Sequence, residues 1–119
     1  MYSVVQEKSE KFALRIVGLN KHLCEKSEYV LSKQILRCGT SIGANIVESE
    51  YAISKKEFVA KMQIALKECA ETEYWLRLLN KSNLIGEKEF LSMQRDCSEI
   101  LKMLTSIVRT SKKNVKKGL

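Results

Sequence analysis

The chain contains no proline in its 119 residues and only five glycines. These two residue types are the ones that most often end helices and build tight turns. Long uninterrupted helices are therefore allowed throughout the chain, and a β-rich fold with many turns is disfavoured. The length fits one domain, and a hydrophobic content of 45% indicates a globular chain rather than a disordered one.

Four segments carry apolar residues at alternating steps of three and four, the pattern of a helix buried along one side. We predict helices over about Ser3–Cys24, Glu28–Tyr51, Lys55–Lys81 and Glu87–Thr110. Short connections between them favour sequential antiparallel neighbours, so the predicted fold is an all-α, up-down-up-down four-helix bundle. Residues 1–111 would form this bundle domain, and residues 112–119 a mobile basic tail.

The predicted helix starts carry recognisable signals. Ser27 is expected to be the N-cap of the second helix, with Glu28 as an acid in its first turn. Ser54 and Glu57 fit a capping box at the start of the third helix. Ile53 and Phe58 occupy the positions of a hydrophobic staple around that cap.

The second helix contains an unusual stretch of small and polar residues, Cys38–Glu48. Each glycine inside a helix costs about 1 kcal/mol relative to alanine, so Gly39 and Gly43 suggest a close approach by another helix. The small residues Ala65 and Cys69 make the third helix the expected neighbour.

Polar residues of the same stretch share one helical face, since they are spaced at i, i+4 and i+7. They would face acids of the third helix and form either a hydrogen-bonded layer that fixes helix register or an assembly interface. An adjacent aromatic pair on the third helix would flank the core or contact another subunit. The candidate residues are Ser41, Asn45, Glu48, Glu71, Glu73, Tyr74 and Trp75.

Metal, cofactor and catalytic sites are not expected. The four cysteines are widely spaced without a Cys-x-x-Cys motif, and His22 is the single histidine. Cys38, Cys69 and Cys97 fall on apolar stripes, where reduced cysteine acts as a small hydrophobic residue. General base chemistry would be limited to carboxylates or lysines, so we expect a protein that is not an enzyme.

Positive charge is concentrated at the C-terminal end. The net charge is +7, and no acid follows Glu99. Such lysines either bind phosphates through counterion release or form a solubilising end. The first helix carries a smaller basic flank, which is a solvated face or an extension of a binding surface. Together the candidate nucleic-acid contacts are Lys8, Lys11, Arg15, Arg109, Lys112, Lys113, Lys116 and Lys117.

No apolar stretch approaches the roughly 18 residues of a membrane span. Residues 1–10 are charged and lack the apolar run of a signal peptide. The cytoplasm is therefore the expected compartment, and no membrane partner is expected.

Two segments together resemble a known family. Ser41-Ile42-Gly43-Ala44-Asn45-Ile46-Val47-Glu48 is similar to a Ser-Ile-Gly-Ala-Asn-Ile-Ala-Glu pattern, and residues 54–58 and 64–76 match a Ser-x-x-Glu-Phe start and the helix after it. This is the family of small four-helix bundles encoded in intervening sequences of bacterial 23S ribosomal RNA genes. The chain has Ser49 where the family has glycine, so the second helix is expected to run further, and Glu68 where the family has serine.

The resemblance implies a ring-like homopentamer without enzymatic activity. Relatives include accessory proteins of diversity-generating retroelements, which resemble basic pentameric barrels that bind nucleic acid and a reverse transcriptase. Our first hypothesis is an oligomer that binds RNA or DNA with little sequence selectivity, because no motif for base readout is present. The alternative is a protein–protein interaction module, an accessory subunit that does not itself bind nucleic acid.

Overall fold

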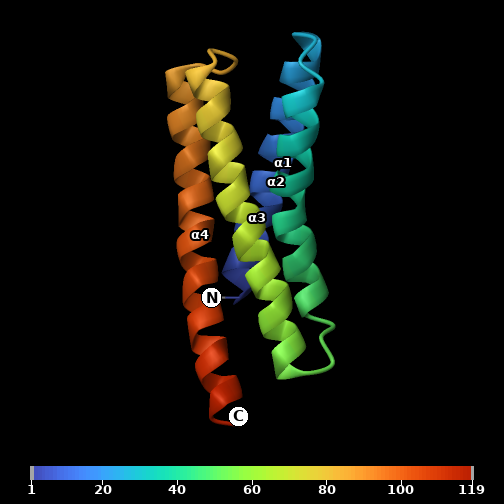
Figure 1. The fold of residues 1–119 in the computed structure, drawn as a ribbon, viewed down its shortest axis with the longest axis vertical. Helices are drawn as coiled ribbons and strands as arrows, with labels where there is room; N and C mark the ends of the chain where they lie inside the picture. The colour runs from blue at the N-terminus through green and yellow to red at the C-terminus, as the bar shows by residue number, and fades with distance from the viewer. Residues whose placement is uncertain (1, 119) are drawn as a thin grey trace.

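The computed structural model describes residues 2–118, and these form four helices without a strand (Figure 1). The helices are α1 (Tyr2–Glu25), α2 (Val30–Ser49), α3 (Lys55–Lys81) and α4 (Glu87–Lys116). Successive helices run in opposite directions and lie side by side, which confirms the predicted up-down-up-down bundle. No helix within residues 2–118 combines the length and apolarity needed to cross a lipid bilayer.

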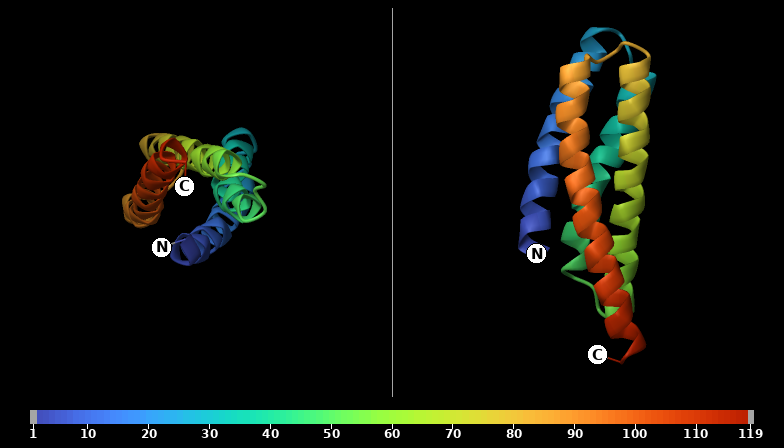
Figure 2. Two further views of the ribbon diagram at one scale, coloured as in Figure 1. Left: turned by 90° about the horizontal axis from the view of Figure 1, so that it is seen from below. Right: turned by 90° about the vertical axis from the view of Figure 1, so that its left-hand side faces the viewer.

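The four helices do not pack equally closely. α2 lies between α1 and α3, and α3 lies between α2 and α4. Of the four pairs of helices in contact, α1 and α4 pack least extensively (Figure 2). At one end of the bundle α4 projects beyond the other helices. This end therefore presents a helix with few neighbours.

The core is formed by the apolar stripes that the sequence predicts. Phe12, Ile16 and Leu23 of α1 are 1% exposed or less, as are Leu76 and Leu79 of α3. In the second half of α2, Ile46 is fully buried, whereas Asn45, which continues the regular spacing of the stripe from Cys38 and Ile42, is only half-buried. A stripe with a repeat of seven residues drifts around the axis of a straight helix, so Ile46 takes the buried position instead of Asn45.

The two helical glycines of α2 contact α1. A Cβ atom placed on Gly39 would lie 2.7 Å from Cγ1 of Ile16, and one on Gly43 would lie 3.4 Å from Oγ of Ser9. The predicted close approach is therefore confirmed, and the helix that the two glycines contact is α1. The predicted neighbour α3 also packs closely against α2, with Ala65 and Cys69 buried. Ile16 is a β-branched, fully buried residue that takes the volume a side chain at Gly39 would need.

The connection before α2 differs from the prediction. Ser27 has a φ of +61° and follows α1, where its N–H donates to the carbonyl of Cys24 at 3.0 Å. Ser27 therefore belongs to the end of α1, in the left-handed position that commonly closes a helix. The cap of α2 comes instead from Glu28, whose carboxylate accepts the N–H groups of Val30 at 3.0 Å and Leu31 at 2.7 Å.

At the start of α3, half of the predicted arrangement is present. Ser54 Oγ accepts the N–H of Glu57 at 3.0 Å, as a capping box requires. The Glu57 carboxylate accepts the N–H of Ile53 at 3.1 Å, one residue earlier than the capping box predicts. The predicted staple is wrong, because the Ile53 side chain is 93% exposed.

Two helix ends were also predicted wrongly. α2 ends at Ser49, short of Tyr51, and turns there without a glycine. α4 continues to Lys116, past the predicted end at Thr110 and into the segment assigned to the tail. Lys113 and Lys116 stand in its last turn, where positive charge interacts favourably with the helix dipole.

All four cysteines are free thiols, as expected. Sγ of Cys69 in α3 lies 3.7 Å from Sγ of Cys97 in α4, and both side chains are fully buried. Burial raises the pKa of the Cys38 thiol to about 11, and the contact with Cys69 together with burial raises the pKa of Cys97. Only Cys24 is partly exposed.

Replacing Gly39 with alanine should destabilise the bundle. Overpacking a core costs about 1–3 kcal/mol, whereas alanine gains about 1 kcal/mol over glycine inside a helix. We expect the free energy of unfolding to fall by up to about 2 kcal/mol in urea titrations. Gly18→Ala is the matched control, because nothing lies within 4 Å of its Cβ position. That variant should gain up to about 1 kcal/mol, and equal effects of both variants would contradict the close contact.

The thiols should differ in reactivity. Because a thiolate is the reacting species, the native protein should expose one thiol to a disulfide reagent such as DTNB at about pH 8, and the denatured protein four. Cys24→Ser should leave no rapidly reacting thiol in the native protein. Rapid reaction of two or more thiols in that variant would show that the core opens readily.

Candidate functional site

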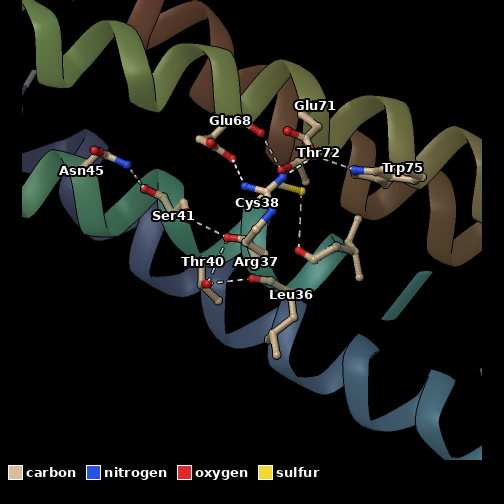
Figure 3. A network of polar contacts seen from close by, with 11 residues as sticks. Leu36, Arg37, Cys38, Thr40, Ser41, Asn45, Glu68, Glu71, Thr72 and Trp75 are labelled. Atoms are coloured by element: carbon tan, nitrogen blue, oxygen red, sulfur yellow. Dashed lines mark hydrogen bonds and ion pairs between the residues drawn. The ribbon is translucent and has the colours of Figure 1, made fainter. Parts of the chain in front are cut away.

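A charged network joins α2 to α3 around Arg37 (Figure 3). The Arg37 guanidinium pairs with Glu68 at 3.1 Å and also with Glu71. Glu71 accepts a further hydrogen bond from Nε1 of Trp75 at 2.9 Å. Arg37 was not among the predicted site residues, although it lies one turn before Ser41 on the same face of α2.

The predicted polar face of α2 is mostly bonded to its own helix. Ser41 Oγ donates to the carbonyl of Arg37 at 2.7 Å, and Asn45 Nδ2 donates to the carbonyl of Ser41 at 2.8 Å. Such bonds to the preceding turn are common for short polar side chains inside helices. Glu48 pairs with Lys61 of α3 at 2.7 Å. The structure therefore does not bring these three residues to the acids of α3.

The remaining candidates on α3 lie on two sides of the helix. Glu73 faces α4, where its carboxylate accepts hydrogen bonds from Ser98 at 2.8 Å and Gln94 at 3.3 Å. Tyr74 is 48% exposed and meets Trp75 edge-on, with 5.1 Å between ring centroids. Trp75 itself is half-buried beside the core.

The charges in the Arg37 network stabilise one another. The hydrogen bond from Trp75, and then those from Arg37, lower the pKa of the Glu71 carboxyl group. The hydrogen bond to Glu71 raises the pKa of Arg37. Because Glu71 and Arg37 are 35% and 50% exposed, water screens the pair and its contribution to stability is about 1 kcal/mol or less.

The three candidate basic residues of α1 each form an ion pair with an acid. Lys8 pairs with Glu99 of α4, and Arg15 pairs with Asp96 of α4 at 2.6 Å. Lys11 pairs with Glu7 one turn away on α1 at 3.0 Å. The predicted basic flank of the first helix is therefore largely used to hold α1 beside α4.

Basic residues at the end of α4 have a different environment. Because the helix continues to Lys116, residues Arg109, Lys112, Lys113 and Lys116 are spaced at i, i+3, i+4 and i+7 and share one face. None of them, nor Lys117, forms an ion pair with another residue in the range 2–118. The same range holds no group of three His, Cys, Asp or Glu side chains placed to hold a metal ion.

The fluorescence of Trp75, the single tryptophan, should report the ionisation of Glu71. We expect an acid titration with a midpoint below 4.5, the ordinary pKa of the group, since its partners favour the carboxylate. The stabilisation contributed by the Glu71 carboxylate is fully present above the ordinary pKa of 4.5. It is lost as the pH falls through the lowered pKa of the folded protein. Glu71→Gln should abolish the transition, whereas Glu68→Gln, which removes an Arg37 partner that does not bond Trp75, should keep it. A midpoint at or above 4.5 would contradict the network.

Comparisons with known proteins agree with this architecture. Residues 2–106 match the family model described as 23S rRNA-intervening sequence protein. A crystal structure of a protein with unknown function from the S23 ribosomal protein family of Bacteroides thetaiotaomicron VPI-5482 is 52% identical, with a TM-score of 0.89. The similarity covers 91% of this chain and 97% of that chain. A search of curated proteins gave no match. The chain belongs to the family of 23S rRNA-intervening sequence proteins.

Proposed function

We propose that the protein is a non-enzymatic, homo-oligomeric bundle that binds nucleic acid with little sequence selectivity through the C-terminal end of α4. The observation that carries this proposal is the difference between two sets of cations. The three candidates on α1, Lys8, Lys11 and Arg15, are paired with carboxylates. The α4 residues Arg109, Lys112, Lys113 and Lys116 share one helical face without an ion pair among residues 2–118. Unpaired cations on one face bind phosphates by releasing the counterions around them.

Assembly would strengthen such contacts. The family resemblance implies a homopentamer, and a ring would present several copies of the α4 end to one ligand, so that weak contacts reinforce one another. Exposed apolar side chains near the connection between α2 and α3 favour self-association, because large apolar groups gathered at a surface commonly mark interfaces. These residues are Val47, Tyr51 and Ile53, at 53%, 76% and 93% exposure.

The test is binding of labelled RNA and DNA by fluorescence anisotropy across about 50–200 mM salt, with protein of mass known from light scattering. The test variant carries glutamine at Lys112, Lys113, Lys116 and Lys117. Loss of four phosphate contacts should reduce the slope of log affinity against log salt by roughly 3, for every sequence tested.

The matched control carries glutamine at four exposed lysines elsewhere, Lys21, Lys33, Lys67 and Lys81. It changes the net charge equally and should largely retain the slope of the unmodified protein. Equal losses in the two variants would show that general charge, rather than the α4 end, drives binding. An oligomer that binds no nucleic acid at low salt would refute the proposal and favour the alternative, a module that binds another protein.

A further inference from the structure

Cations recur along much more of α4 than its C-terminal end. Arg95, Lys102, Arg109 and Lys116 occupy every seventh position, and all four are exposed. Positions seven apart drift by only about 20° around a straight helix, so the four side chains follow one line on the outer face. We call this line the α4 basic stripe. At 1.5 Å per residue it is roughly 32 Å long.

The charge of the α4 basic stripe is not cancelled by acids of its own helix. Asp96 and Glu99, the acids nearest to Arg95 and Lys102 in sequence, pair with Arg15 and Lys8 of α1. No stripe residue forms an ion pair with any residue that the structure describes. The contacts that hold α1 to α4 therefore also leave the outer face of α4 positively charged.

The stripe widens toward the C-terminal end of α4, the helix whose tip reaches beyond the other helices (Figure 2). Lys112 and Lys113, about 100° apart around the helix, stand on either side of the line from Arg109 to Lys116. The opposite side of α4 packs against the start of α3, around a hollow lined by Lys55, Phe58, Ser111 and Asn114. The C-terminal end of α4 therefore has a side packed against α3 and, facing away from it, a broad basic side.

The residue types on this face favour a duplex over a single strand. Proteins that bind single strands combine a basic groove with aromatic side chains on which bases stack. Phe90 is the one aromatic residue of α4, and it packs against the core. Among the side chains whose burial the structure describes, the exposed large aromatic ones are Tyr29, Tyr51 and Tyr74, and none of them lies on α4. The face can contact phosphates but has no stacking platform.

We infer, building on the proposed function, that the basic side of the C-terminal end of α4 binds in the major groove of B-form duplex DNA, with Lys102 and Arg95 extending the phosphate contacts along the stripe. The major groove of B-DNA is about 12 Å wide and admits an α-helix, and phosphates line both of its walls. A helix with cations to either side of its central line matches both walls. The major groove of A-form RNA is too deep and narrow for this arrangement.

The test compares three ligands of one mixed sequence: duplex DNA, duplex RNA and single-stranded DNA. At about 150 mM salt, the full chain should bind duplex DNA at least tenfold more tightly than the other two. Equal affinity for the single strand would contradict the preference for a duplex. Equal affinity for duplex RNA would contradict binding in the major groove of B-form DNA. Absence of binding to all three would instead refute the proposed function on which the inference rests.

The second arm replaces Arg95 and Lys102 with glutamine. Loss of two phosphate contacts should weaken binding to duplex DNA about tenfold and lower the salt slope by roughly 1.8. Lys33→Gln combined with Arg77→Gln removes the same charges from exposed sites outside α4 and should change the affinity less than about twofold. Equal weakening by the two double variants, with circular dichroism showing both folded, would overturn the role of the stripe.

Discussion

The contact between Ile16 and Gly39 sets the position of α1, and much of the structure follows from it. A side chain at Gly39 would overlap Ile16, so glycine is what allows the two helices to approach this closely. With α1 seated there, Arg15 and Lys8 reach Asp96 and Glu99 of α4. Those ion pairs remove both acids from the outer side of α4. A packing requirement in α2 thereby influences the electrostatics of a helix on the other side of the bundle.

The sequence predicted the helices well and their ends less well. The repeating apolar steps determine which residues are buried, because a helix that repeats them can hide only one face. Helix ends depend on single backbone conformations that a pattern does not encode. Ser27 adopts a positive φ and so cannot cap the next helix, and α4 continues because its last lysines suit the helix dipole. The contact of the glycines with α1 was not predicted, because the small residues on α3 pointed only to the packing of α3 against α2.

The sequence shows which candidate site residues carry charge, but it does not show which of them form ion pairs with one another. Composition alone identifies the lysines of the C-terminal segment. Whether a cation is free depends on partners far away in the chain, such as Asp96 for Arg15, and no local pattern reveals them. Arg37 was missed for the same reason, because its partners Glu68 and Glu71 belong to the next helix. Only the extension of α4 into a regular helix places the terminal cations on one face.

The looser packing between α1 and α4 has a consequence for how the chain folds. Every other helix contact joins neighbours in sequence, so it can form as soon as two consecutive helices exist. Chains dominated by such local contacts fold quickly. The seam between α1 and α4 joins the two ends of the chain and must wait for the whole of it. On the ribosome, three helices can assemble while the fourth is still being made, and the ion pairs of Lys8 and Arg15 complete the bundle last.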